Sequence, residues 1–134
     1  MTAQGDSIVA FLDSAITARE EAAYAAPRSP WSVRVDDDAL VAPDGIPVVE
    51  AFALSGQQTR AILNLVALHD PASALRRCAA DRKLIALHSP VGEWDLGCKG
   101  CGFNNQEESM VDRYQDCPVL RALAEGYGWT EGER

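Results

Sequence analysis

The stretch Cys98-Lys99-Gly100-Cys101-Gly102 decides how the C-terminal third of this chain folds. Two thiols at this spacing can bind one metal ion together, and the glycines let backbone amides turn towards the sulfurs. We call residues 98–102 the knuckle. A third thiol, Cys117, follows it and stands directly before Pro118. The pattern predicts that Cys98, Cys101 and Cys117 bind one metal ion.

A structural zinc site needs a fourth ligand, and four residues are candidates. His88 fits best, because it ends a predicted helix shortly before the knuckle and a neutral imidazole binds zinc well. Cys78 lies on an apolar helix face, which is typical of a small buried core residue. His69, near a helix C-terminus, and Asp116 are the remaining two candidates. We predict one structural Zn²⁺ per chain, bound by His88, Cys98, Cys101 and Cys117.

A structural role for this zinc follows from the composition of residues 89–117. They contain few large apolar side chains, whereas ordering a residue costs about 1–2 kcal/mol. A bound metal would offset that cost. Three thiolates and an imidazole also fill the coordination shell, which leaves no open position for a water nucleophile. We therefore expect a zinc-knuckle extension over 89–134, packed on a core formed by residues 1–88 as a single compact unit.

The N-terminal part of the chain predicts a helix followed by a small sheet. Apolar residues recur at helical spacing over residues 6–24. Short stretches with strand character then follow in residues 31–53. They are separated by Asp36-Asp37-Asp38 and by Pro43-Asp44-Gly45, which is a turn signature. A three-stranded antiparallel sheet is the expected result.

Two central helices complete the predicted α+β fold. The first covers residues 57–69, with Ile62, Leu65 and Val66 on its apolar side. The second begins at Asp70-Pro71, because Asp at the N-cap and Pro in the first turn favour a helix start. It continues to His88, and a short helix over 119–125 follows the knuckle extension.

Charge and apolar content limit the function and the location of the chain. The 134 residues carry 12 basic and 20 acidic side chains, a net charge of −8, which disfavours a protein that coats DNA or an anionic membrane. No apolar run reaches the roughly 20 residues of a membrane span, and no secretory signal pattern occurs. We expect a cytoplasmic protein. Its basic patch lies on the central helices, at Arg60, Arg76, Arg77, Arg82 and Lys83.

The knuckle and its neighbours resemble a known family. The pattern includes His69-Asp70-Pro71, a basic helix that ends at His88, Cys98-x2-Cys101, and a closing Cys117-Pro118-Val119-Leu120-Arg121. Together with Pro30-Trp31, it is similar to a small domain family of actinobacteria and their bacteriophages whose function is unknown. The resemblance spans nearly the whole chain and implies such a source. It also supports His88 beside the three cysteines. The acidic loop around residues 106–112 departs from the family pattern.

These observations favour a binding protein over an enzyme. The sequence contains no nucleophile elbow and no phosphate-binding glycine loop. We expect a small zinc-stabilised protein-interaction module, a phage or mobile-element factor that binds a host protein. The alternative is a nucleic-acid-binding regulator that uses the basic helix 71–88. Aromatic residues anchor many interfaces, and the candidate contacts are Trp94, Phe103, Tyr127 and Trp129.

Overall fold

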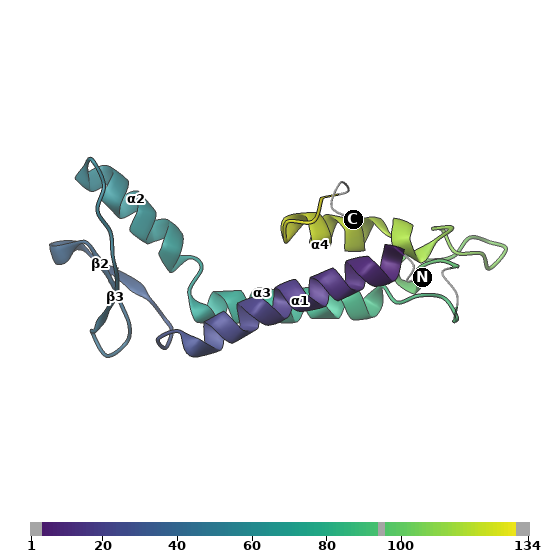
Figure 1. Ribbon diagram of the computed structural model, residues 1–134, viewed down its shortest axis with the longest axis horizontal. Helices are drawn as coiled ribbons and strands as arrows, with labels where there is room; N and C mark the ends of the chain where they lie inside the picture. The colour runs from purple at the N-terminus through teal and green to yellow at the C-terminus, as the bar shows by residue number, and fades with distance from the viewer. Residues whose placement is uncertain (1–3, 94–95, 131–134) are drawn as a thin grey trace. The chain divides into compact units, whose positions relative to one another are not determined.

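The computed structural model describes residues 4–93 and 96–130, and Figure 1 shows its helices and strands. The chain divides into two compact units. The terminal unit consists of residues 1–18 and 79–134, and the central unit consists of residues 19–78. Helices α1 (Gln4–Ala25) and α3 (Pro71–Leu87) each belong to both units. The first part of α1 and the last part of α3 lie in the terminal unit, and the remainder of both helices lies in the central unit. The boundary after residue 88 that the sequence suggested stays a prediction.

The predicted α+β fold is confirmed. The described residues form four α-helices and one three-stranded antiparallel sheet. Besides α1 and α3, the helices are α2 (Gly56–Ala67) and α4 (Pro118–Gly126). The strands are β1 (Ser32–Arg34), β2 (Ala39–Val41) and β3 (Pro47–Glu50). Three short 3-10 turns are η1 (Val35–Asp37), η2 (Lys99–Cys101) and η3 (Tyr114–Asp116).

The sheet of the central unit is a meander with the order β1-β2-β3. Asp38, between β1 and β2, adopts a left-handed conformation with a φ of 48°. Gly45 turns the chain between β2 and β3 with a φ of 80°, where glycine meets no steric penalty. The Asp44 carboxylate accepts a hydrogen bond of 3.0 Å from the Ile46 amide in the same turn. Both predicted turns are therefore present.

Helix α2 packs on β1 and β2 through a different face from the predicted one. Its buried residues are Thr59 and Leu63, whereas Ile62 and Leu65 are exposed. The predicted apolar side of this helix was therefore wrong. The strands are only three residues long, so they cover a narrow stripe of the helix. Hydrophobicity alone does not say which of two adjacent apolar stripes meets so small a sheet.

The helix start at Asp70-Pro71 is confirmed. The Asp70 carboxylate accepts hydrogen bonds from the backbone amides of Ser73, at 3.0 Å, and Trp31, at 3.2 Å. The Ser29 hydroxyl accepts another bond from the Ala72 amide, at 2.9 Å. Three backbone donors near the start of α3 and β1 thus find partners within the central unit.

The core of the terminal unit joins the first part of α1 to α4 and to the cysteine segment. Where α1 lies beside α3 in this unit, Arg82 donates hydrogen bonds to Asp13, at 3.0 Å, and to Thr17, at 3.1 Å (Figure 1). The buried residues of this core are Ile8, Leu12, Cys98, Tyr114, Cys117, Leu120, Leu123 and Ala124. Two cysteines of the predicted metal site therefore lie inside the main apolar cluster of the unit.

None of the helices that the structure describes combines the length and the apolar character that crossing a bilayer requires.

Candidate metal centre

A short hairpin brings the knuckle to the end of α3. Pro90 pairs with Cys98 in an isolated antiparallel bridge. The Val91 amide donates to the Gly97 carbonyl at 3.1 Å, and the Lys99 amide donates to the Ser89 carbonyl at 2.9 Å. His88 directly precedes this hairpin. The pairing of Pro90 with Cys98 therefore places the knuckle next to the imidazole.

Helix α4 supplies the third thiol. Cys117 is the residue that caps the N-terminus of this helix, and Pro118 occupies its first turn. The apolar side of α4 is buried in the terminal core through Leu120, Leu123 and Ala124. This packing holds the N-terminus of α4, and with it Cys117, in the terminal core.

The four predicted ligands lie together, and their spacing fits a tetrahedral ion. All four ligand atoms lie within 4.8 Å of one another. The His88 Nδ1 atom is 3.2 Å from the Cys98 sulfur, 3.5 Å from the Cys117 sulfur and 3.7 Å from the Cys101 sulfur. The sulfurs of Cys101 and Cys117 are 3.7 Å apart. Tetrahedral zinc would require about 3.6 Å between nitrogen and sulfur and about 3.8 Å between sulfurs. The residues can therefore hold such an ion with little movement.

One nitrogen of the imidazole faces all three sulfurs. Each of the contacts between His88 and a thiol involves Nδ1. A metal bound between these residues would therefore take the lone pair of Nδ1, with the proton of the neutral ring on Nε2. The protein offers three sulfurs and one nitrogen, which is a donor set that suits zinc.

Burial makes isolated thiolates unfavourable in this cluster. Cys98 and Cys117 are fully buried, and Cys101 is partly buried. Burial raises the pKa of the Cys101 thiol to about 12, and hydrogen bonds with Cys98 and Cys117 act in the same direction. Burial also raises the pKa of Cys117, although the backbone amides of Leu120 and Val119 oppose this. A divalent cation would supply the positive charge that stabilises these thiolates.

Two residues beside the ligands support the knuckle, and only one of them drew attention in the sequence. A Cβ atom at Gly100 would lie 2.5 Å from the Leu87 carbonyl oxygen and 2.7 Å from His88 Nδ1. The Ser109 hydroxyl accepts a 3.2 Å bond from the Cys98 amide. Sequence reasoning missed Ser109, because nothing in the residues around it signals a contact with Cys98. Gly97 also lies close to Ser109, since a Cβ there would lie 2.5 Å from the Ser109 hydroxyl.

The segment between the knuckle and Ser109 forms a second small hairpin. We call residues 102–110 the knuckle hairpin. Phe103 and Ser109 form a bridge, and the Met110 amide donates to the Gly102 carbonyl at 2.9 Å. The Asn104 side chain closes the turn by accepting a bond of 2.8 Å from the Gln106 amide. Phe103 is 49% exposed and Met110 is 65% exposed, so the hairpin presents two apolar side chains.

The three remaining candidate ligands do not belong to the group. Cys78 is buried in the central unit, as expected of a core residue. His69 is exposed just after α2. The Asp116 carboxylate lies 3.5 Å from the Arg121 guanidinium, which gives it a cationic partner. His88 is therefore the residue that completes the set.

Two of the aromatic residues considered as partner contacts are used inside the terminal unit. Trp129 packs edge-on against Phe11, with ring centroids 5.1 Å apart. The Tyr127 hydroxyl donates a bond of 2.6 Å to the buried Asp81 carboxylate. Trp94 lies outside the described residues. Of the four aromatics, Phe103 is the described one that is largely exposed.

Comparison with known proteins identifies a family but no function. A family model described as "Family of unknown function (DUF6221)" matches residues 5–128. This confirms the resemblance of nearly the whole chain to a family without an assigned role, while the actinobacterial source stays a prediction. No curated protein and no solved structure matches the chain.

Proposed function

Since the chain belongs to the DUF6221 family, we propose its role from its own residues: a small zinc-stabilised module that binds a protein partner in the cytoplasm. The observation that carries the proposal is the convergence of His88 Nδ1 and three cysteine sulfurs at tetrahedral spacing. Three thiolates and one imidazole complete the coordination of zinc, so the ion would be structural. A reducing compartment keeps such thiols available for metal.

A structural ion explains how the terminal unit orders a segment with little apolar content. His88 directly follows α3, Cys98 and Cys101 belong to the knuckle, and Cys117 directly precedes α4. One ion bound to all four would connect these three parts of the chain. When bound, zinc supplies coordinate bonds whose free energy becomes part of the folding free energy.

The knuckle hairpin is the proposed contact with the partner. It starts next to the ligand Cys101 and presents Phe103 and Met110, both largely exposed. Aromatic residues and methionine are enriched at protein interfaces. The metal would therefore hold in place the segment that makes the contact.

Native and denaturing mass spectrometry of the untagged chain, purified without chelator, tests the metal. We expect one zinc per chain under native conditions and none after denaturation. Cys98→Ser and His88→Ala should lose the zinc, whereas Cys78→Ser, which alters a buried cysteine outside the group, should retain it. A folded wild-type chain without zinc would contradict the proposal.

Crosslinking in a lysate tests the partner contact separately. A photoreactive amino acid in place of Phe103 should give a saturable crosslink to one protein, and the same probe in place of exposed Glu125 on α4 serves as the control. The crosslink should disappear when zinc is removed. Equal crosslinking from both positions, or none from position 103, would exclude the knuckle hairpin as a contact.

A further inference from the structure

The central unit exposes many large apolar side chains. Among the described residues, its large exposed hydrophobic side chains are Tyr24, Val35, Ile46, Phe52, Leu54, Ile62, Leu65 and Leu68. Phe52 is 88% exposed and Leu54 is 99% exposed, and both lie in the segment between β3 and α2. Exposed apolar groups that lie close together mark interaction sites.

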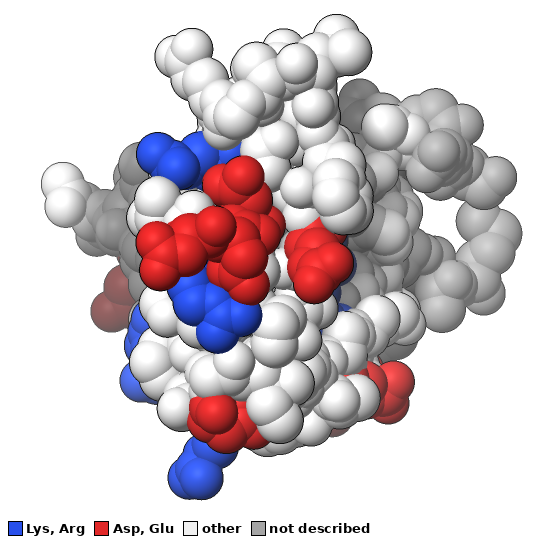
Figure 2. All heavy atoms as spheres, turned by 90° about the vertical axis from the view of Figure 1, so that its left-hand side faces the viewer, with Lys and Arg blue, Asp and Glu red and all other residues white. Residues whose placement is uncertain are grey.

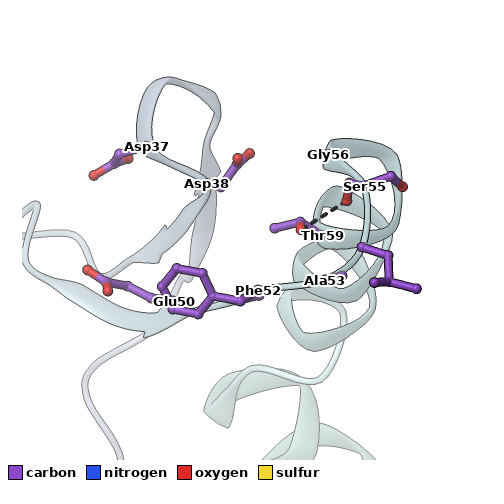
Figure 3. Close-up of a pocket in the computed structure, with 10 residues that line it drawn as sticks. Asp37, Asp38, Glu50, Phe52, Ala53, Ser55, Gly56 and Thr59 are labelled. Atoms are coloured by element: carbon purple, nitrogen blue, oxygen red, sulfur yellow. Dashed lines mark hydrogen bonds between the residues drawn. The ribbon is translucent and has the colours of Figure 1, made fainter.

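A pocket opens beside this segment. It has a volume of about 450 Å³ and lies between the η1 corner, the segment after β3 and the first turn of α2. Figure 3 shows the Phe52 ring extending across the pocket towards Glu50, with Asp38 on the opposite side. Thr59 on α2 closes the pocket, and its hydroxyl donates to the Ser55 carbonyl at 3.1 Å (Figure 3).

The charge of the pocket selects the chemistry of an occupant. Its ionisable lining residues are Asp37, Asp38 and Glu50, all of them acidic. Asp37 pairs with Arg34 at 2.6 Å, and Asp38 lies 3.8 Å from Arg60. With these two arginines included, residues 31–60 carry five acidic side chains and two basic ones, a net charge of −3. Figure 2 views the molecule from the left-hand side of Figure 1, and it shows acidic side chains gathered on the face towards the viewer.

The edge of the sheet offers backbone groups next to the same pocket. Within the described chain, β3 pairs with β2 on one side. The other side of β3 forms the edge of the sheet. The strand ends at Glu50, and the segment that lines the pocket follows directly. An extended peptide can add to such an edge as a further strand, while side-chain pockets determine which peptide is accepted. Pro47 at the start of β3 restricts pairing to the end nearest Glu50.

We propose that this pocket is a second interaction site, which accepts an arginine or lysine side chain from an extended segment of a partner protein. The cation lies over the Phe52 ring, between the carboxylates of Glu50 and Asp38, and apolar neighbours in the segment contact Leu54. An aromatic face and carboxylates both attract a guanidinium or ammonium group. Symmetric pairing with the same face of a second copy fits poorly, because two faces of the same negative charge repel each other.

Fluorescence anisotropy with a labelled peptide of alternating valine and arginine, added to the full zinc-loaded chain, tests the site. We expect saturable binding that weakens at least about fivefold in Phe52→Ala and in Glu50→Gln, since each removes one attraction for the cation. The same peptide with citrulline in place of arginine keeps the shape, loses the charge and should bind at least about tenfold more weakly.

Asp112→Asn is the matched control. It removes one negative charge from an exposed position in the terminal unit and should leave binding unchanged. Absence of binding by the arginine peptide, or equal binding of the citrulline peptide, would overturn the proposal. Equal weakening by Glu50→Gln and Asp112→Asn would also overturn it, because the attraction would then be general. Zinc content measured on the same samples keeps this result separate from the metal proposal.

Discussion

At the scale of single residues, Gly100 controls the distance between the knuckle and the imidazole. The Gly100→Ala variant places a Cβ 2.5 Å from the Leu87 carbonyl and 2.7 Å from His88 Nδ1, and backbone cannot yield easily there. We expect zinc affinity to fall about 10–100-fold, as when a group that orients a ligand is lost. Competition with a chromophoric chelator measures this.

Gly126→Ala is the control for that variant. Gly126 ends α4 in the same unit, and nothing lies within 4 Å of a Cβ built there. Zinc affinity should stay at the wild-type value, and thermal stability should stay equal or rise slightly because alanine favours a helix. Unchanged affinity in Gly100→Ala would show that the imidazole does not need its present position.

At the scale of elements, Asp70 stabilises the start of α3 in a pH-dependent way. Burial alone would raise the pKa of this carboxyl, but hydrogen bonds from Ser73 and Trp31 and the charge of Arg76 outweigh it and hold the pKa below the ordinary 3.8. A carboxyl with a lowered pKa in the folded state stabilises the fold above its unfolded-state pKa, about 3.9. That contribution is lost as the pH falls through the folded-state pKa.

The Asp70→Ala variant should therefore lower the free energy of unfolding by about 1–2 kcal/mol at neutral pH. Asp70→Asn keeps an oxygen acceptor but no titrating charge, so it should lose less. Urea unfolding followed by circular dichroism at several pH values measures both. The difference between wild type and Asp70→Asn should shrink below about pH 4. A constant difference across this range would mean that the charge of Asp70 contributes nothing.

At the scale of the whole molecule, the two units should respond differently to removal of the metal. All four candidate ligands belong to the terminal unit. Hydrogen–deuterium exchange after chelation should increase strongly over residues 96–117 and stay unchanged over β1, β2 and α2, because those elements contain no ligand. Uniform loss of protection along the chain would indicate one cooperative fold instead. No change anywhere would remove the structural role of the ion.

The sequence predicted features that depend on neighbouring residues better than those that depend on distant ones. The cysteine spacing, the cap at Asp70 and the turn at Gly45 follow local chemistry, and the structure contains each arrangement. The buried face of α2 depends on a three-residue strand elsewhere, so the apolar stripe with Ile62 was chosen in place of Leu63. The sequence also did not reveal the division into two units, because α1 and α3 are continuous helices that contribute to both.

The terminal unit is built from two stretches of the chain that are separated by the central unit, and this has a consequence for biosynthesis. Residues 19–78 leave the ribosome as an unbroken stretch and can fold as soon as they emerge. The first part of α1 emerges before them, yet Ile8 and Leu12 share their apolar cluster with Leu120 and Leu123, which are translated much later than α1. The apolar side of this helix must wait until α4 has been translated. A nascent chain stalled before Cys117 would therefore bind a chaperone there, and release would require translation through α4.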